Sequence, residues 1–310
     1  MRSFSLRIAF LGLAVALAVA LLAGCSVVRL AYSQLDRWLA WRVEEYVTLT
    51  PGQRAWLGER LQAHLAWHCR TQLPAYADWL RSLRAELERA PPDSARLRDH
   101  ARQVERFFDA MLETLAPTAA ELLVRLDASQ RAELFARLDE RIAEARAEYV
   151  DPPPDRQQHV RAERLENRLK LWLGDLSPAQ VARVQQWSVA LGDQNAGWLE
   201  SRQRLLAEVR ATLAGADAVS ARPRLVHLLR APASARTEAD RRRIDHGRAE
   251  AIALGADLLQ SITAAQRLQL QRRLREWAED FEAVKGVCSR NGNSITTGFQ
   301  PVVIELYISN

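Results

Sequence analysis

The chain has 310 residues, of which 48% are hydrophobic and 26% are charged, and this composition is typical of a folded protein rather than a disordered one. Its formal net charge is +5, but all basic residues except Lys170 and Lys285 are arginines, and they alternate with Glu and Asp at helical spacings, as in RLDERIAEARAE. Because no run of like charge forms a stripe that follows phosphates, we expect no nucleic-acid partner.

Residues 1–24 have the features of a signal peptide. Arg2 and Arg7 precede an unbroken apolar run over residues 8–23, which is short for a permanent membrane helix. The run ends in Leu-Ala-Gly-Cys, which resembles the bacterial lipobox, and this resemblance implies that the sulfur of Cys25 carries a lipid. The alternative is a plain signal anchor in which Cys25 has no such role.

The residue after Cys25 bears on localisation. In Gram-negative lipoproteins that resemble this chain, Asp at that position favours the inner membrane, whereas here it is Ser26. We therefore expect an outer-membrane lipoprotein that faces the periplasm and contacts the membrane through its lipid. Sequence with a helical pattern begins shortly after Cys25, so the folded body should lie close to the membrane. Trp38 and Trp41 then lie either at the membrane interface or in the bundle, and we favour the bundle.

Two further cysteines, Cys69 and Cys288, would then be in an oxidising compartment. No sequence pattern places them within bonding distance. Because Cys288 lies in an anomalous tail, we expect no structural disulfide.

One short phrase occurs four times, as LTPGQR, LDASQR, LSPAQV and ITAAQR. Each copy has an apolar residue, a helix-capping residue, and a glutamine three positions after the capping residue. This is the capping-box pattern, so each copy predicts the start of an amphipathic helix. The leading, capping and glutamine residues are Leu49, Thr50 and Gln53; Leu126, Asp127 and Gln130; Leu176, Ser177 and Gln180; and Ile262, Thr263 and Gln266.

The copies alternate in type. The first and third carry Pro51 and Pro178 after the capping residue, and the second and fourth carry Ala128 and Ala264. We interpret this order as a duplication that gives a first helical unit (25–150) and a second (151–285), divided at the triple proline 152–154. Independent convergence on good capping residues is the alternative.

These phrases resemble the LTxxQ motif of the periplasmic Spy/CpxP proteins, which are all-α and linked to chaperone activity and envelope stress. The match is strict at Leu49, Thr50 and Gln53 and looser in the other copies. The chain up to residue 285 also resembles a proteobacterial lipoprotein family of unknown function. Both resemblances imply an all-α fold and a place in the cell envelope, and neither implies an enzymatic activity.

The remaining pattern is helical, and we expect an all-α, elongated multi-helix bundle. Breaks are predicted at residues 90–94, at Pro117, at 151–155, at 174–178 and at 231–237; Pro74 should kink or split the first long helix, and one helix of about 55 Å could run from Ser177 to Gly215. The tail, residues 286–310, differs in composition and includes a strand-like segment. It is either a foreign end or a genuine appendage.

Few residues suggest catalysis. His64 and His68 are four residues apart, but the catalytic zinc pattern requires Glu where Leu65 stands. We expect no metal, no cofactor and no catalytic residue. Two functions from different classes remain: a chaperone-like or stress-sensing protein that binds envelope proteins, and an assembly factor that docks one specific envelope partner. A broad, exposed apolar surface would favour the first, and a polar exterior the second.

Overall fold

The computed structural model describes residues 35–215, 217–230 and 237–288, with Ala218 and residues 285–288 described by their backbone alone. This part of the chain is helical and contains no strand, which confirms the expected all-α class. Its elements are α3 (Leu35–Glu44), α4 (Pro51–Trp67), η1 (His68–Gln72), α5 (Leu73–Arg89), α6 (Ser94–Arg125), α7 (Ala128–Ala145), η2 (Arg146–Val150), α8 (Pro154–Leu173), α9 (Pro178–Ala190), α10 (Asn195–Gly215), α11 (Ala218–Arg230), α12 (Glu238–Ser261) and α13 (Ala264–Cys288), where η marks a π-helical turn.

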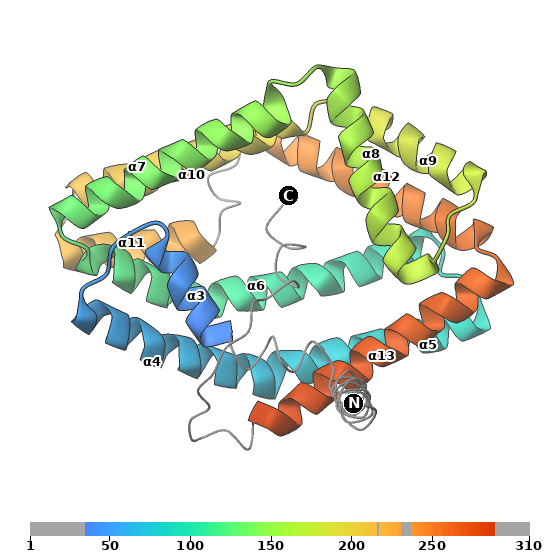
Figure 1. Cartoon of the computed structure of the whole chain (residues 1–310), viewed down its shortest axis with the longest axis horizontal. Helices are drawn as coiled ribbons and strands as arrows, with labels where there is room; N and C mark the ends of the chain where they lie inside the picture. Colours follow the sequence, from blue (N-terminus) through green and yellow to red (C-terminus); the bar gives the residue numbers. More distant parts are fainter. Residues whose placement is uncertain (1–34, 216, 231–236, 289–310) are drawn as a thin grey trace, which may run out of the picture.

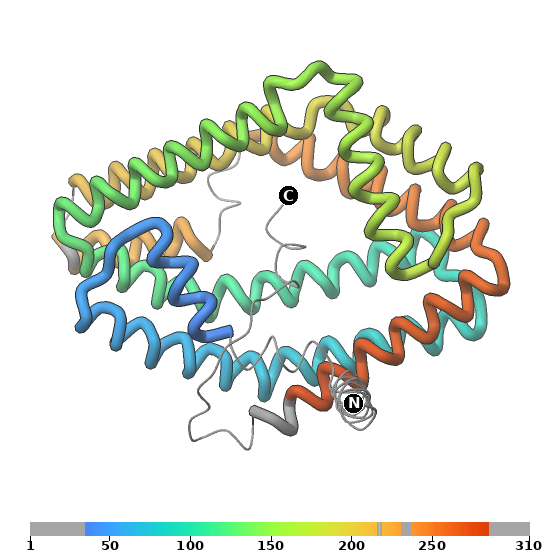
Figure 2. Tube along the Cα trace, viewed as in Figure 1, coloured from blue at the N-terminus to red at the C-terminus, as the bar shows by residue number. Residues whose placement is uncertain are grey.

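The helices follow an elongated ring (Figure 1). Helices α4, α5 and α13 form one long side, and α7, α10 and α12 form the other, as the chain trace shows (Figure 2). Helix α6 runs between the two ends and packs on α11, α12 and α4. The two ends of the ring are therefore joined by long helices and not by a common central core.

Helices from the two sequence units pack on each other. Helix α13 lies along α5, α11 lies along α6, and α12 crosses α6. The proposed duplication at residue 151 stays a prediction about the origin of the chain. In the structure, helices of residues 151–285 pack directly on helices of residues 25–150.

The apolar core is divided into separate clusters around the ring. One lies at the start of α4 and includes Leu49 and Leu57, a second joins α6, α10 and α11 around Leu225, and a third joins α5 to α13 around Leu87. Two smaller clusters join α8, α9 and α12, and η1 to α13. Each helix pair therefore has its own apolar contact.

Two prolines inside predicted helices behave differently. At Pro74 the long helix is interrupted: α4 ends at Trp67, the π turn η1 follows, and α5 begins at Leu73, which donates its N–H to the carbonyl of His68, five residues back. This wider turn gives the proline ring room. The predicted break at Pro117 is wrong: α6 runs through it, and the buried residues Ala116 and Ala120 hold the helix on its neighbours.

The long helix that the sequence pattern would allow from Ser177 to Gly215 is divided into α9 and α10. Helix α9 ends at Ala190, and Gly192 adopts the left-handed backbone conformation with φ of 62° before α10 begins. Glycine adopts this conformation without steric cost, so the Leu-Gly pair acts as a helix stop. The guanidinium of Arg161 donates to the carbonyls of Ser188 and Gly192 and satisfies the exposed end of α9.

The proline-rich stretch at the predicted unit boundary forms a corner of the ring. The π turn η2 ends at Val150, and α8 begins at Pro154. The side-chain amide of Gln157 donates to the carbonyls of Val150 and Pro152, both at 2.8 Å, and accepts a bond from Asn195 on α10. Side-chain amides thus satisfy carbonyls that the prolines leave without a helical donor.

Cys69 corrects one expectation. It is completely buried beside Leu73 and Val284, and it is disulfide-bonded. The expectation of no structural disulfide is therefore wrong, and the bonded sulfur of its partner lies outside the side chains that the structure describes. The packing of α13 against η1 creates this environment, and sequence spacing does not reveal such a tertiary contact.

Candidate functional site

The four repeated phrases meet in two pairs. At one end of the ring, the side-chain amides of Gln53 and Gln130 bond each other reciprocally, at 3.0 Å and 2.7 Å. Each amide also donates to the backbone carbonyl two residues before the other's capping residue: Gln53 to Arg125, and Gln130 to Thr48. The two helix starts are therefore joined through their capping glutamines.

The same arrangement occurs at the opposite end. Gln180 and Gln266 bond each other at 3.0 Å and 2.9 Å, and their amides also donate to the carbonyls of Ser261 and Asp175. Gln180 is 1% exposed. As in the first pair, each carbonyl lies two residues before the other glutamine's capping residue. Because the bonds within each pair are reciprocal, each pair has approximate local two-fold symmetry.

Every polar group of these glutamines has a partner. Each Oε1 accepts from the N–H of its own capping residue and from the opposite glutamine, and each Nε2 uses both its hydrogens. The capping residues Thr50, Asp127, Ser177 and Thr263 accept from the N–H of the corresponding glutamine. Glutamine is the capping-box residue that both donates and accepts, so it can pair with its own kind, whereas an ionised glutamate only accepts.

Two of the three arginines that directly follow these glutamines bond the end of another helix. Arg131, after Gln130, donates to the carbonyl of Leu213 at the end of α10, and Arg267, after Gln266, donates to the carbonyl of Leu87 at the end of α5. Each arginine thus caps a helix from the other sequence unit, where a cation also complements the helix dipole. The same Gln-Arg sequence therefore makes the same kind of helix-end contact at both ends of the ring.

A fifth capping box begins α12, and it contains a buried carboxylate, that of Asp240. Thr237 and Asp240 form the box, and Asp240, 1% exposed, also accepts from Arg204 and Arg243. Burial alone would raise the pKa of this carboxyl, but the bonds from Thr237 and the two arginines outweigh burial and hold the pKa well below its usual range. Sequence reasoning missed this box because Asp, not Gln, stands at its third position.

Room for Arg243 comes from a glycine on α10. A Cβ atom on Gly197 would lie 1.9 Å from a terminal nitrogen of Arg243. The absent side chain thus lets the guanidinium reach Asp240. Arg204 comes from α10 as well, so this cluster ties α10 to α12.

The two neighbouring histidines have separate surroundings. His64 lies 2.8 Å from the hydroxyl of Thr118 on α6. His68 lies in η1 with its ring edge-on to Tyr76, and burial lowers its pKa to about 4. Among the residues that the structure describes, no group of three or more His, Cys, Asp and Glu side chains is placed to hold a metal ion.

A third histidine lies in a mixed aromatic and charged cluster. His100 accepts from the indole N–H of Trp79 at its Nδ1, so its Nε2 carries the proton toward Glu86, 2.9 Å away. Glu86 also bonds Arg96, and that bond, together with the bond from His100, outweighs the effect of burial and lowers the pKa of the Glu86 carboxyl. These hydrogen bonds join α5 to α6, and the side chains of Trp79, Glu86, Arg96 and His100 all take part in them.

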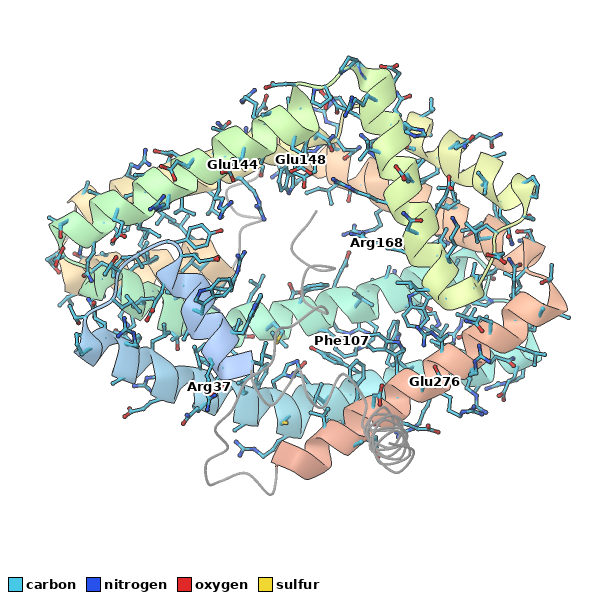
Figure 3. All side chains as sticks on the ribbon, viewed as in Figure 1. Arg37, Phe107, Glu144, Glu148, Arg168 and Glu276 are labelled. Atoms are coloured by element: carbon cyan, nitrogen blue, oxygen red, sulfur yellow. The ribbon has the colours of Figure 1, made fainter. Side chains whose placement is uncertain are left out.

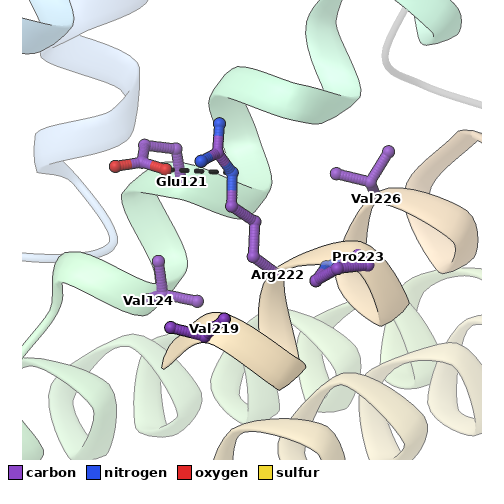
Figure 4. A pocket seen from close by; sticks show the side chains of 6 residues that line it. All are labelled: Glu121, Val124, Val219, Arg222, Pro223 and Val226. Atoms are coloured by element: carbon purple, nitrogen blue, oxygen red, sulfur yellow. Dashed lines mark ion pairs between the residues drawn. The ribbon is translucent and has the colours of Figure 1, made fainter. Parts of the chain in front are cut away.

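A groove lies between α6 and α11. It has a volume of about 640 Å³ and is lined by Glu121 and Val124 of α6 and by Val219, Arg222, Pro223 and Val226 of α11 (Figure 4). Asp109, Glu113, His227 and Arg230 extend it along the same two helices. The floor is aliphatic, the α6 wall is acidic, and the α11 wall is basic.

Ion pairs hold the two walls together. Arg222 lies 3.0 Å from Glu121, which also pairs with Arg125, and Arg230 pairs with Glu113. Pro223 has no N–H, so the carbonyl of Val219 lacks its helical donor. Val219 is 85% exposed at the mouth of the groove. An aliphatic side chain and a backbone N–H of a bound polypeptide would find matching groups here.

The glutamine pairs are bonded to each other, whereas the groove is a surface feature between α6 and α11. Of the residues singled out in the sequence, Leu49 and Leu126 are buried beside the first pair, and Cys25 lies outside the described residues. None of the described helices combines the length and apolar character needed to span a bilayer. Sequence reasoning missed the groove because nothing in the pattern of α11 distinguishes it from a packed helix.

Comparison with known families places the chain. A family model described as a family of unknown function, DUF6279, matches residues 45–241. The chain belongs to this family. Neither the curated proteins nor the solved structures gave a significant match. The DUF6279 match covers the first three repeated phrases and the whole α6–α11 groove, and it ends before Gln266.

Proposed function

We propose that this DUF6279 protein is a non-enzymatic lipoprotein, anchored by a lipid on Cys25 to the outer membrane and facing the periplasm, that binds a polypeptide of the cell envelope in the α6–α11 groove. The lipobox-like sequence and Ser26 support the location. The resemblance to LTxxQ proteins supports it too, as does the disulfide at Cys69, which suits an oxidising compartment. The aliphatic floor between oppositely charged walls is the observation that carries the binding role.

The distribution of apolar surface favours one specific partner over many clients. The large hydrophobic side chains exposed on the described body come one each from six helices: Trp41, Phe108, Leu171, Val189, Val219 and Leu268. A chaperone for unfolded proteins needs a broad apolar surface, whereas single scattered residues are ordinary. The geometry thus supports the docking of one envelope partner better than the chaperone-like alternative.

The groove can be tested by photocrosslinking in intact cells. A photoreactive amino acid at Arg222 should give one dominant crosslinked product. Val219→Glu places a charge at the groove mouth without disturbing the core. It should reduce this product about tenfold, since a valine that becomes buried under a bound partner contributes roughly 1.5–3 kcal/mol to binding. The yield of product on a denaturing gel is the measurement.

Val189→Glu is the matched control, because Val189 is also exposed but lies on α9, at another part of the ring. It should leave the product unchanged. Many weak products, equally affected by both variants, would support the chaperone-like alternative. A single product that survives Val219→Glu would remove the groove as its binding site.

Anchoring should depend on the sulfur of Cys25, because no other group in the proposed lipobox can carry the thioether lipid. Cys25→Ser should accumulate as an unprocessed precursor and fail to incorporate labelled palmitate, whereas Cys69→Ser should still be labelled. Palmitate incorporation and the size of the product are the measurements. Labelling that persisted in Cys25→Ser would overturn the proposed anchor.

A further inference from the structure

The first described helix lies on the outside of the body. Leu39, Ala40 and Val43 of α3 pack on the cluster at the start of α4, but no residue of α3 is fully buried. Figure 1 shows α3 on the near face of the ring. Its opposite face therefore points away from the core.

Trp41 lies on that outer face, one turn after Arg37. All nine tryptophans of the chain fall within the described residues, and Trp41, 54% exposed, is the only one in the exposed class. Trp38 is half-buried, and the Arg42 guanidinium lies over its ring at 5.7 Å. Of the two sequence alternatives for this pair, packing in the bundle therefore does not apply to Trp41.

The length of chain before α3 limits how far this face can lie from a lipid on Cys25. The chain advances by ten residues from Cys25 to Leu35. Even fully extended, they span at most about 35 Å. An exposed indole at this distance suits the membrane interface, where its ring can be buried while its N–H stays in the polar layer.

We propose that the outer face of α3, centred on Trp41, rests on the membrane surface that carries the lipid anchor, with the Trp41 indole at the level of the headgroups. This inference rests on the proposed lipidation of Cys25. It gives the body a fixed orientation: α3 faces the bilayer, and the rest of the ring extends from it.

The charges of α3 indicate what kind of contact this is. Within α3, Arg37 and Arg42 are offset by Asp36 and Glu44, and Glu45 directly follows the helix. Arg42 pairs with Glu45, and Glu44 pairs with Arg54 of α4. Because the charges nearly cancel, the contact should come from the indole and not from attraction to anionic lipid, so it should not depend on salt.

Tryptophan quenching by brominated lipid tests this proposal. The full-length lipidated protein is reconstituted into phosphatidylcholine vesicles whose acyl chains carry bromine near the headgroup end, because bromine quenches only indoles that it contacts. We expect quenching relative to unbrominated vesicles, unchanged between low and high salt. Trp41→Phe should remove most of this quenching.

Trp172→Phe is the matched control, since Trp172 stacks on Trp277 with a centroid distance of 5.9 Å and is not in the exposed class. It should keep the quenching. Protein that floats with the vesicles but shows no quenching, or quenching that Trp41→Phe retains, would overturn the contact and leave the anchor intact. Protein that does not float with the vesicles would instead contradict the proposed lipidation.

Discussion

Replacing Asp240 with alanine should lower the free energy of unfolding by about 3–5 kcal/mol, the range seen when one partner of a buried ion pair is removed. The carboxylate is 1% exposed and accepts from Arg204, Arg243 and Thr237. Its loss would leave the guanidinium of Arg243, whose side chain is 16% exposed, without its counter-charge and would remove the capping box of α12. Denaturant unfolding followed by circular dichroism measures this change.

Asp257→Ala provides the control on the same helix. Asp257 also pairs with an arginine, Arg183 at 2.7 Å, but its side chain is half exposed, so its loss should cost at most about 1 kcal/mol. Equal losses in the two variants would show that the Asp240 cluster has no special weight.

The effect of Asp240 should also depend on pH. Its pKa in the folded protein lies below the usual value, so its stabilisation is fully present above the pKa of aspartate in the unfolded chain, about 3.9. It is lost as the pH falls through the lower folded value. The stability difference between the wild type and Asp240→Asn should therefore be constant near neutral pH and shrink below about pH 4.

Replacing Gln180 with leucine should cost about 2–4 kcal/mol, because the change removes a capping interaction and leaves the buried amide of Gln266 without one acceptor and one donor. Gln266→Leu should cost a similar amount. The double variant should cost less than the sum of the two, since it leaves no glutamine side-chain amide without its partner. Thermal and denaturant unfolding of all four proteins complete the cycle.

Gln157→Leu serves as a control for the cycle. It also removes a glutamine that donates to two carbonyls, but Gln157 has no part in either glutamine pair. Its cost should add to that of Gln180→Leu without coupling. Additive costs for Gln180→Leu and Gln266→Leu would mean that the two glutamines do not act as a pair.

The sequence allowed the helix starts to be predicted, because capping is local: a side chain bonds a backbone group three residues away. It did not predict that Gln53 meets Gln130 and that Gln180 meets Gln266, because these contacts join residues far apart in the chain. A signal was present, however. All four copies use glutamine where glutamate would cap equally well, and only the amide can bond a second amide in both directions.

Two expectations that the structure contradicts, the helix break at Pro117 and the absence of a disulfide, have the same origin. Pro117 lies within α6 and Cys69 is disulfide-bonded because neighbouring helices hold these segments in place. Such packing overrides local preference and leaves no trace in local spacing. Gly192 was a local signal that the periodicity of the surrounding residues obscured. The α6–α11 groove depends wholly on how two distant helices pack, so its place could not be predicted.

The pairing of α5 with α13 has a consequence for how the chain acquires its structure. Helix α5 lies in the first third of the sequence, and α13 begins only at Ala264. A contact of such long sequence separation forms late, since a large loop must close first. Until then, the apolar face around Leu80 and Leu87 has no cover. A chain threaded through a membrane from its N-terminus would therefore expose that face for most of its passage, when it is most open to aggregation or to protection by other proteins.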